Sequence, residues 1–316
     1  MENKVNVQMD KKSTILICVL IFSLLFVSFF VSLTRFSDNV PNEHVISEEE
    51  SYVSDRIDDV SVENTSIPTP SVNKYDYYDS INYTKVPVSN SNVKNGSLVL
   101  VDGSVGCSVS DDELVPIHSS RTGKYDLKDY SLRLKKEAIK NIDLFIMSFY
   151  SKYKNNGLGI AEGYKTAVSG AETDLSTGYS VKLTTYKTSN TLSDEDFGYL
   201  KEQSFKYGII QRFPGGKKDS TGFDENLSIY RYVGLVHSCY MNHYNLSLEE
   251  YIDKIKTEKV IEYKNNYESD SVYVVYYVPM DQSKDTTHVN VPSDERYECT
   301  ISGDGSNGFI VTVKIK

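Results

Sequence analysis

The sequence predicts an α+β domain that follows a membrane-spanning segment and precedes an all-β module. Three observations support this prediction. Positions 15–33 contain no charged residue, apolar residues recur at helical spacing between residues 128 and 156, and residues 257–316 are rich in β-branched and aromatic residues. The 316 residues suffice for one or two domains with a sizeable core. The formal net charge of -10 argues against a nucleic-acid partner.

The N-terminal apolar segment predicts a membrane anchor. Residues 15–33 would span roughly 28 Å as a helix, close to the thickness of one hydrocarbon core. Lys11 and Lys12 precede the segment, and the chain after it is mainly acidic. The positive-inside rule therefore predicts a cytoplasmic tail (residues 1–14), a single-pass cell-membrane anchor (15–34) and an extracellular C-terminal domain. A cleaved signal peptide is the alternative, but its apolar region should be shorter, about 7–15 residues.

Composition divides the rest of the chain into three parts. Residues 35–95 are rich in Ser, Asn, Asp and Glu and contain the segment Ile67-Pro-Thr-Pro-Ser71, which is typical of a disordered stalk. Residues 96–256 alternate between helical and strand-like patterns, and residues 257–316 are strand-like throughout. We therefore predict a stalk, a folded α+β domain and a C-terminal β module.

Each predicted element has its own signal. A capping box of Ser247 and Glu250 starts the last helix, and the acidic residues after Ser193 favour a helix start. Helices are predicted over 128–156, 194–206, 235–243 and 248–256. Strands are predicted over 97–102, 158–161, 178–186, 207–213, 228–233, 272–278, 288–291 and 309–315.

Two short motifs are misleading. Gly303-Asp-Gly-Ser-Asn-Gly308 has the spacing of a dinucleotide-binding loop, but a strand-like segment follows it where that loop needs a helix, so we predict a hairpin turn. Cys239 and His243 are four residues apart on a predicted helix, yet no further metal ligand is adjacent. Apart from Cys18 in the predicted anchor, the cysteines are three and widely spaced, so they form no disulfide framework and at most one pair.

Several short segments occur in a characteristic order. They are Glu162-Gly-Tyr-Lys-Thr166, Phe197-Gly-Tyr-Leu200, Lys206-Tyr-Gly-Ile-Ile-Gln-Arg-Phe-Pro214, Tyr230-Arg-Tyr-Val-Gly234 and Leu248-Glu-Glu-Tyr251. In this order and spacing, over roughly residues 97–256, the chain resembles the VanY-type zinc D-alanyl-D-alanine carboxypeptidases. The resemblance implies a small antiparallel sheet flanked by helices and an activity on peptidoglycan peptides.

The resemblance also implies where a zinc ion would be held. When the family's first zinc segment is laid on Thr177-Gly178, the ligand His position holds Leu175 and the ligand Asp position holds Lys182. When the second is laid on Tyr230-Arg-Tyr, the catalytic Glu position holds Asn226 and the second ligand His position holds Ile229. We therefore expect no intact catalytic residue, no metal and no other cofactor.

The chemistry of these four residues supports that expectation. Catalytic zinc needs three protein ligands and an open position for water, and Leu175 and Ile229 have no lone pair to donate. The charge of Lys182 would repel the ion. Asn226 cannot accept a proton, and a general base typically contributes about 10²–10⁴ in rate. The sequence therefore predicts a pseudo-enzyme.

Four residues border the family's pocket and are candidates for substrate binding: Lys165, Thr166, Arg212 and Arg231. The alternative for the two arginines is a structural ion pair within the sheet. A further hypothesis pairs Lys182 with Asp174, so that the lysine takes the place of the metal ion.

The leading functional prediction is a membrane-anchored extracellular protein that binds peptidoglycan stem peptides or an envelope partner without cleaving them. Two alternatives remain open at this point. One is a working carboxypeptidase with substitute ligands from His237 or His243. The other is an envelope scaffold with no ligand.

Overall fold

The computed structural model describes most of the chain after residue 75. The described residues are 76–101, 106–119, 121, 125–154, 157–166, 168–185, 194–268 and 271–315. All of them belong to one structural unit, Pro70–Lys316. The predicted tail and anchor and most of the predicted stalk lie outside the described residues. Within the described ranges, no helix is both long and apolar enough to cross a membrane.

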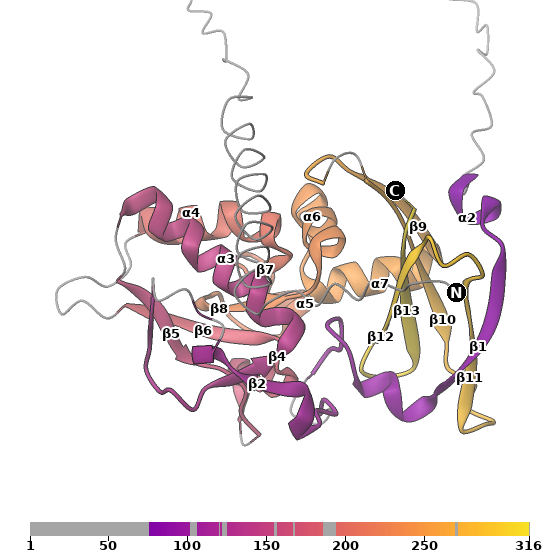
Figure 1. Ribbon diagram of the computed structural model, residues 1–316, viewed down its shortest axis with the longest axis horizontal. Helices are drawn as coiled ribbons and strands as arrows, with labels where there is room; N and C mark the ends of the chain where they lie inside the picture. Colours follow the sequence, from indigo (N-terminus) through magenta and orange to yellow (C-terminus); the bar gives the residue numbers. More distant parts are fainter. Residues whose placement is uncertain are drawn as a thin grey trace, which may run out of the picture. The chain divides into compact units, whose positions relative to one another are not determined.

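A five-stranded sheet forms the centre of the domain, in the strand order β3-β5-β6-β8-β7. All neighbours are antiparallel except β3 and β5. The strands are β3 (Asp126–Leu127), β5 (Leu158–Glu162), β6 (Ser180–Thr185), β7 (Ile209–Phe213) and β8 (Asn226–Tyr232). One face of this sheet packs against the helix α3 (Lys136–Tyr153), whose Ile142 and Phe145 share a core cluster with Val181 and Tyr230 (Figure 1).

The helix α3 is shorter than the sequence predicts. Residues 128–135 are not helical. Arg133–Lys135 form the strand β4, which pairs with β2 (Leu114–Pro116). The backbone N–H of Lys135 also donates to the carbonyl of Gly178, 2.8 Å away. These pairings come from distant parts of the chain, and they override a helical periodicity that continues through this segment.

The remaining helices connect the strands and cover the sheet edges. The capping box at Ser247 and Glu250 is confirmed at the start of α7. The α-helices are α2 (Asp76–Ser80), α4 (Asp194–Ser204), α5 (Lys218–Thr221), α6 (Leu235–Tyr244) and α7 (Leu248–Glu258). The 3-10 helices are η1 (Asn90–Lys94), η2 (Asp111–Glu113), η3 (Ile117–Ser119), η4 (Gly170–Thr177) and η5 (Phe205–Tyr207). The predicted strand over 97–102 is wrong, since no strand lies between η1 and η2 among the described residues.

A four-stranded antiparallel sheet forms the C-terminal part, in the order β12-β13-β10-β9. Its strands are β9 (Val260–Asn265), β10 (Ser271–Pro279), β12 (Glu298–Gly303) and β13 (Gly308–Lys314). The strand β11 (Thr286–Pro292) pairs instead with β1 (Tyr83–Ser89). The predicted stalk is therefore wrong at its end: the chain is folded from Asp76, and β1 supplies a partner strand to the C-terminal module.

The glycine motif at residues 303–308 is a hairpin turn between β12 and β13, as predicted. The carboxylate of Asp304 accepts the backbone N–H groups of Ser306, Asn307 and Gly308 at 2.8–3.1 Å. Lys256 of α7 pairs with the same carboxylate at 2.9 Å. This turn therefore attaches the C-terminal sheet to α7.

Candidate functional site

The candidate site lies on the face of the central sheet opposite α3. Ser180 of β6 lies opposite Arg231 of β8, and Lys182 lies opposite Ile229. Because side chains alternate along a strand, these four residues share one face. The helix η4 packs on this face, since its Asp174 accepts hydrogen bonds from both Ser180 and Arg231.

Two of the four positions assigned to zinc chemistry are neighbours on this face. Lys182 and Ile229 are paired across β6 and β8. Leu175 follows Asp174 in η4, and the side chains of Leu175 and Ile229 are both fully buried. Two segments that were aligned independently to the family pattern therefore come together in space.

The fourth position, Asn226, is at the start of β8. It lies beyond an irregularity in the pairing of β7 with β8. Its side-chain oxygen accepts hydrogen bonds from the backbone N–H and the hydroxyl of Ser228, at 3.0 and 2.8 Å. The amide of Asn226 therefore stabilises a local turn.

Two lysine–glutamate pairs occupy the open part of the face. Lys182 Nζ lies 2.5 Å from Glu172 Oε1, and Lys165 Nζ lies 2.5 Å from Glu162 Oε2. Glu162 is also the strand partner of Lys182 across β5 and β6. The hydrogen bond to Glu172 raises the pKa of Lys182 and lowers that of the glutamate. The hypothesis that Lys182 pairs with Asp174 is wrong, because Glu172 reaches the ammonium instead.

Asp174 is the centre of a buried ionic cluster. Its Oδ1 accepts from Arg212 Nε at 2.7 Å and from Arg231 Nη1 at 2.8 Å. Arg212 also pairs with Glu249 at 2.6 Å, and Arg231 Nη2 donates to the carbonyls of Ser97 and Val99 at 2.8 Å. Burial opposes ionisation of Asp174, but the two arginines outweigh it and hold the pKa of the carboxyl below its usual value.

This cluster places two of the predicted substrate-binding residues in the interior. The side chains of Arg212 and Arg231 are 2% and 0% exposed, and both are engaged with carboxylates or carbonyls. Lys165 is 41% exposed, and Thr166 is exposed. In this conformation of the protein, a ligand can therefore reach Lys165 and Thr166 from solvent. Binding by the two arginines stays a prediction.

The residues that the resemblance places at the family's ligand positions do not fit a zinc ion. Leu175 and Ile229 present only carbon atoms, and Lys182 presents a cation that is already paired with Glu172. Zinc requires nitrogen, sulfur or oxygen donors in a tetrahedral arrangement. Across the described part of the chain, no cluster of three or more His, Cys, Asp and Glu side chains is suited to a metal ion.

The two histidines proposed as substitute ligands lie elsewhere. His237 is buried, its Nδ1 lies 2.7 Å from the Tyr251 hydroxyl, and its Nε2 lies 3.1 Å from the Thr312 hydroxyl. Burial lowers the pKa of His237 to about 3, so the ring is neutral. His243 is exposed, whereas Cys239, four residues before it, is buried. The two residues thus differ in exposure, although they lie four positions apart on one helix.

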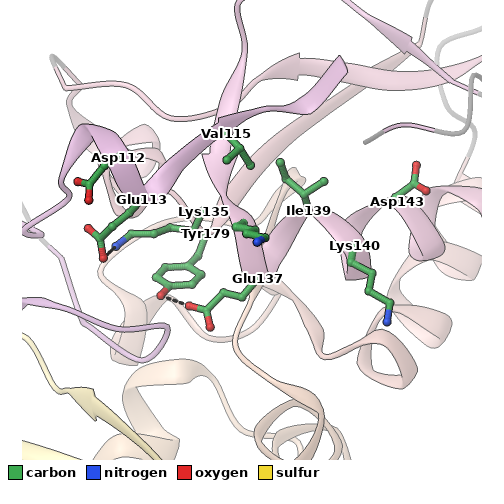
Figure 2. Close-up of a pocket in the computed structure, with 10 residues that line it drawn as sticks. Asp112, Glu113, Val115, Lys135, Glu137, Ile139, Lys140, Asp143 and Tyr179 are labelled. Atoms are coloured by element: carbon green, nitrogen blue, oxygen red, sulfur yellow. Dashed lines mark hydrogen bonds and ion pairs between the residues drawn. The ribbon is translucent and has the colours of Figure 1, made fainter. Parts of the chain in front are cut away.

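A separate cavity was not predicted from the sequence. It has a volume of about 770 Å³ and lies where η2, β2 and β4 meet the start of α3 (Figure 2). Glu113, Lys135, Glu137 and Tyr179 are among the residues that line it. Lys135 gave no signal in the sequence, because it lies within the predicted helix 128–156 and a lysine is usually exposed.

Comparison with known proteins relates parts of the chain to peptidases. No family model matches it. A D-alanyl-D-alanine carboxypeptidase of Enterococcus faecium is 43% identical over 115 residues, which is 36% of this chain and 35% of the relative. A D-alanyl-D-alanine carboxypeptidase of Enterococcus faecalis is 36% identical over 70 residues, 22% of this chain and 25% of the relative. The chain thus spans about a third or less of the length of these curated relatives.

A solved structure shares the fold over most of this chain and nearly all of its own length. It is the vancomycin resistance D,D-dipeptidase VanXYg in complex with a D-Ala-D-Ala phosphinate analogue. The TM-score is 0.60 at 21% sequence identity, over 74% of this chain and 99% of that chain. At this identity the likeness shows a common fold and leaves the activity open. The sequence matches and the shared fold confirm the predicted resemblance of this chain to the VanY-like D-alanyl-D-alanine carboxypeptidases.

Proposed function

We propose that this chain is a zinc-free member of the family that binds peptidoglycan stem peptides at the cell surface without hydrolysing them. The observation that carries the proposal is the pairing of Lys182 with Ile229 beneath η4, with Glu172 neutralising the lysine. On the alignment that the resemblance implies, a lysine–glutamate ion pair and two buried aliphatic side chains take the positions that hold zinc in the family.

Binding is supported by the charges that remain accessible. Lys165 and Lys182 have side chains that are 41% and 32% exposed. An ammonium group can hold a peptide carboxylate by a charge-assisted hydrogen bond. The relatives' names point to D-alanyl-D-alanine peptides, which end in a carboxylate. The carboxylate of the proposed ligand would displace Glu162 from Lys165 or Glu172 from Lys182.

The proposed location follows from the N-terminal sequence. The uncharged residues 15–33 and the lysines before them favour a cytoplasmic N-terminus and an extracellular domain. This places the domain where peptidoglycan is exposed. Labelling of intact cells with a membrane-impermeant reagent tests it: the domain should be labelled, and labelling only after lysis would contradict this location.

Three measurements on the purified chain test the function. We expect no stoichiometric zinc, no release of D-alanine from a stem pentapeptide, and retention on insoluble peptidoglycan. Zinc together with turnover would show a working peptidase and overturn the proposal. Absence of both retention and turnover would favour a scaffold or a protein partner in the envelope.

A further inference from the structure

Three side chains with complementary chemistry meet beside the cavity. Lys135 Nζ lies 2.7 Å from Glu113 Oε1 and 3.2 Å from Asn95 Oδ1. One amine is thus in contact with a carboxylate and with an amide, although 40 residues separate Asn95 from Lys135.

The lysine is held in place by its surroundings. Its side chain is only 5% exposed, and Nζ lies 5.7 Å from the centre of the Tyr179 ring. Figure 2 shows Lys135 extended toward Glu113 along the cavity wall, with Tyr179 beside it. Lysine is rarely this buried. Fixing an amine against one amide removes much of the entropic barrier to reaction between them.

We propose that this cluster is a self-modifying site, at which the Lys135 amine and the Asn95 side-chain amide join in an intramolecular isopeptide bond. The Lys135 amine contacts both the Glu113 carboxylate and the Asn95 side-chain amide. In this proposal Glu113 takes a proton from the attacking nitrogen and returns it to the leaving nitrogen.

The step balances without an external reactant. Glu113 takes a proton from the Lys135 ammonium, and the neutral Nζ attacks Asn95 Cγ. The bond between Cγ and Nδ2 then breaks, while a bond between Nζ and Cγ forms. Glu113 returns its proton to the leaving nitrogen, which also receives the second proton of the amine and departs as an ammonium ion. The chain loses the mass of one ammonia, and nothing is oxidised or reduced.

Before reaction, Lys135 and Glu113 form an ion pair. Burial opposes ionisation of Glu113, but hydrogen bonds from Lys135 and from the backbone of Ser110 outweigh it and keep the pKa of the carboxyl below its usual value. Reaction therefore proceeds through the minor arrangement in which the proton has moved to Glu113. We expect slow maturation after folding, and the linked fraction should increase with the age of the sample.

Tryptic digestion of the reduced full-length chain tests the proposal. Trypsin does not cleave after an acylated lysine. The bond would therefore yield peptide 95–121 joined to peptide 134–136, lighter than the sum of the two by one ammonia. Because Gly96 follows Asn95, cyclisation onto the backbone would also release ammonia, but it would leave the two peptides separate.

Matched variants assign the roles. Lys136→Arg, next to the site, should retain the linked peptide. Lys135→Arg keeps the positive charge without the nucleophile, and Glu113→Gln keeps the shape without the base, so both should lose the linked peptide. Cleavage after Lys135 together with recovery of an unlinked peptide 95–121 from aged wild-type protein would overturn the proposal, whether or not either variant folds.

Discussion

At the residue scale, one aspartate organises the interior of the candidate site. Asp174 receives two guanidinium groups on a single oxygen and a hydroxyl on the other. A pair with Lys182, which is only eight positions away, is the partner that sequence proximity favours. The actual partners, Arg212 and Arg231, lie 38 and 57 positions away and reach Asp174 through the register of β6, β7 and β8. Such pairings depend on tertiary register, which local sequence patterns do not specify.

Replacing Asp174 by Asn should destabilise the fold strongly. The change leaves two buried arginines with one fewer carboxylate, and breaking a buried pair typically costs about 3–5 kcal/mol. Urea unfolding measures the effect. Asp224→Asn is the control, because its pair with Lys218 is mostly exposed, and we expect a change of less than about 1 kcal/mol. Similar losses in the two variants would contradict the structural role of Asp174.

At the element scale, buried side chains tie the C-terminal sheet to the helices. His237 of α6 lies between Tyr251 of α7 and Thr312 of β13, and both of its ring nitrogens are in hydrogen-bond contact. The sequence identified α6 and α7 from their apolar spacing and caps. It did not identify this contact, because His237 and Thr312 are 75 positions apart.

Acidification should weaken this junction. The pKa of His237 is lowered by burial from 6.5 to about 3, so below pH 6.5 the unfolded chain binds a proton that the folded chain excludes. Above pH 6.5, the neutral His237 makes its full contribution to the free energy of unfolding. This free energy should fall by about 1.4 kcal/mol for each pH unit below 6.5, until the pH approaches the pKa of His237 in the folded chain.

Urea unfolding of wild type and His237→Gln over this pH range measures the effect. The variant should show a shallower decline in the free energy of unfolding as the pH falls. His243→Gln, on the exposed side of the same helix, is the control and should follow wild type. Equal slopes for wild type and His237→Gln would refute the assignment.

The strand β1 shows where composition misleads at this scale. Its sequence, Tyr83-Thr-Lys-Val-Pro-Val-Ser89, has the alternation of a strand but lies within a polar segment that also contains proline. Its partner β11 is about two hundred positions away, and only that pairing gives Val86 and Val88 something to pack against. The short strands β9 and β12 were missed for a similar reason, because polar residues interrupt their apolar positions.

A double change in β1, Val86→Ser with Val88→Ser, distinguishes a folded strand from a disordered stalk. Both side chains pack against the C-terminal core cluster, so we expect a loss of roughly 2 kcal/mol in the free energy of unfolding. Thr84→Ala with Lys85→Ala, both exposed on the same strand, should change it by less than about 0.5 kcal/mol. An unchanged midpoint in the valine variant would support the stalk instead.

At the scale of the whole molecule, the predicted boundary at residue 256 does not separate independent parts. The backbone N–H of Gly303 bonds to the carbonyl of Asn95, Lys256 pairs with Asp304, and β1 pairs with β11. The β-strand content after residue 257 was predictable from composition. Its attachment to residues 76–95 was not, because only long-range pairings specify it.

Ligand retention is the property that belongs to the whole molecule. If Lys165 and Lys182 hold a peptide carboxylate, the double variant Lys165→Ala/Lys182→Ala should lose most of its retention on insoluble peptidoglycan. Lys218→Ala removes an exposed lysine elsewhere, so it should bind like wild type. Unfolding curves check that all three chains are folded. If the double variant is retained as well as wild type, these lysines do not contribute to binding.

The burial of Leu175 and Ile229 also determines which mutational steps toward a zinc site are accessible. A histidine at either position alone would enter a fully buried site without a metal, and leaving such a polar group unsatisfied costs about 1–3 kcal/mol. An aspartate in place of Lys182 would leave Glu172 beside a second negative charge. Each of these single substitutions is therefore expected to lower the stability of the fold. Under selection for stability, the burial of Leu175 and Ile229 thus disfavours the stepwise introduction of metal ligands at these positions.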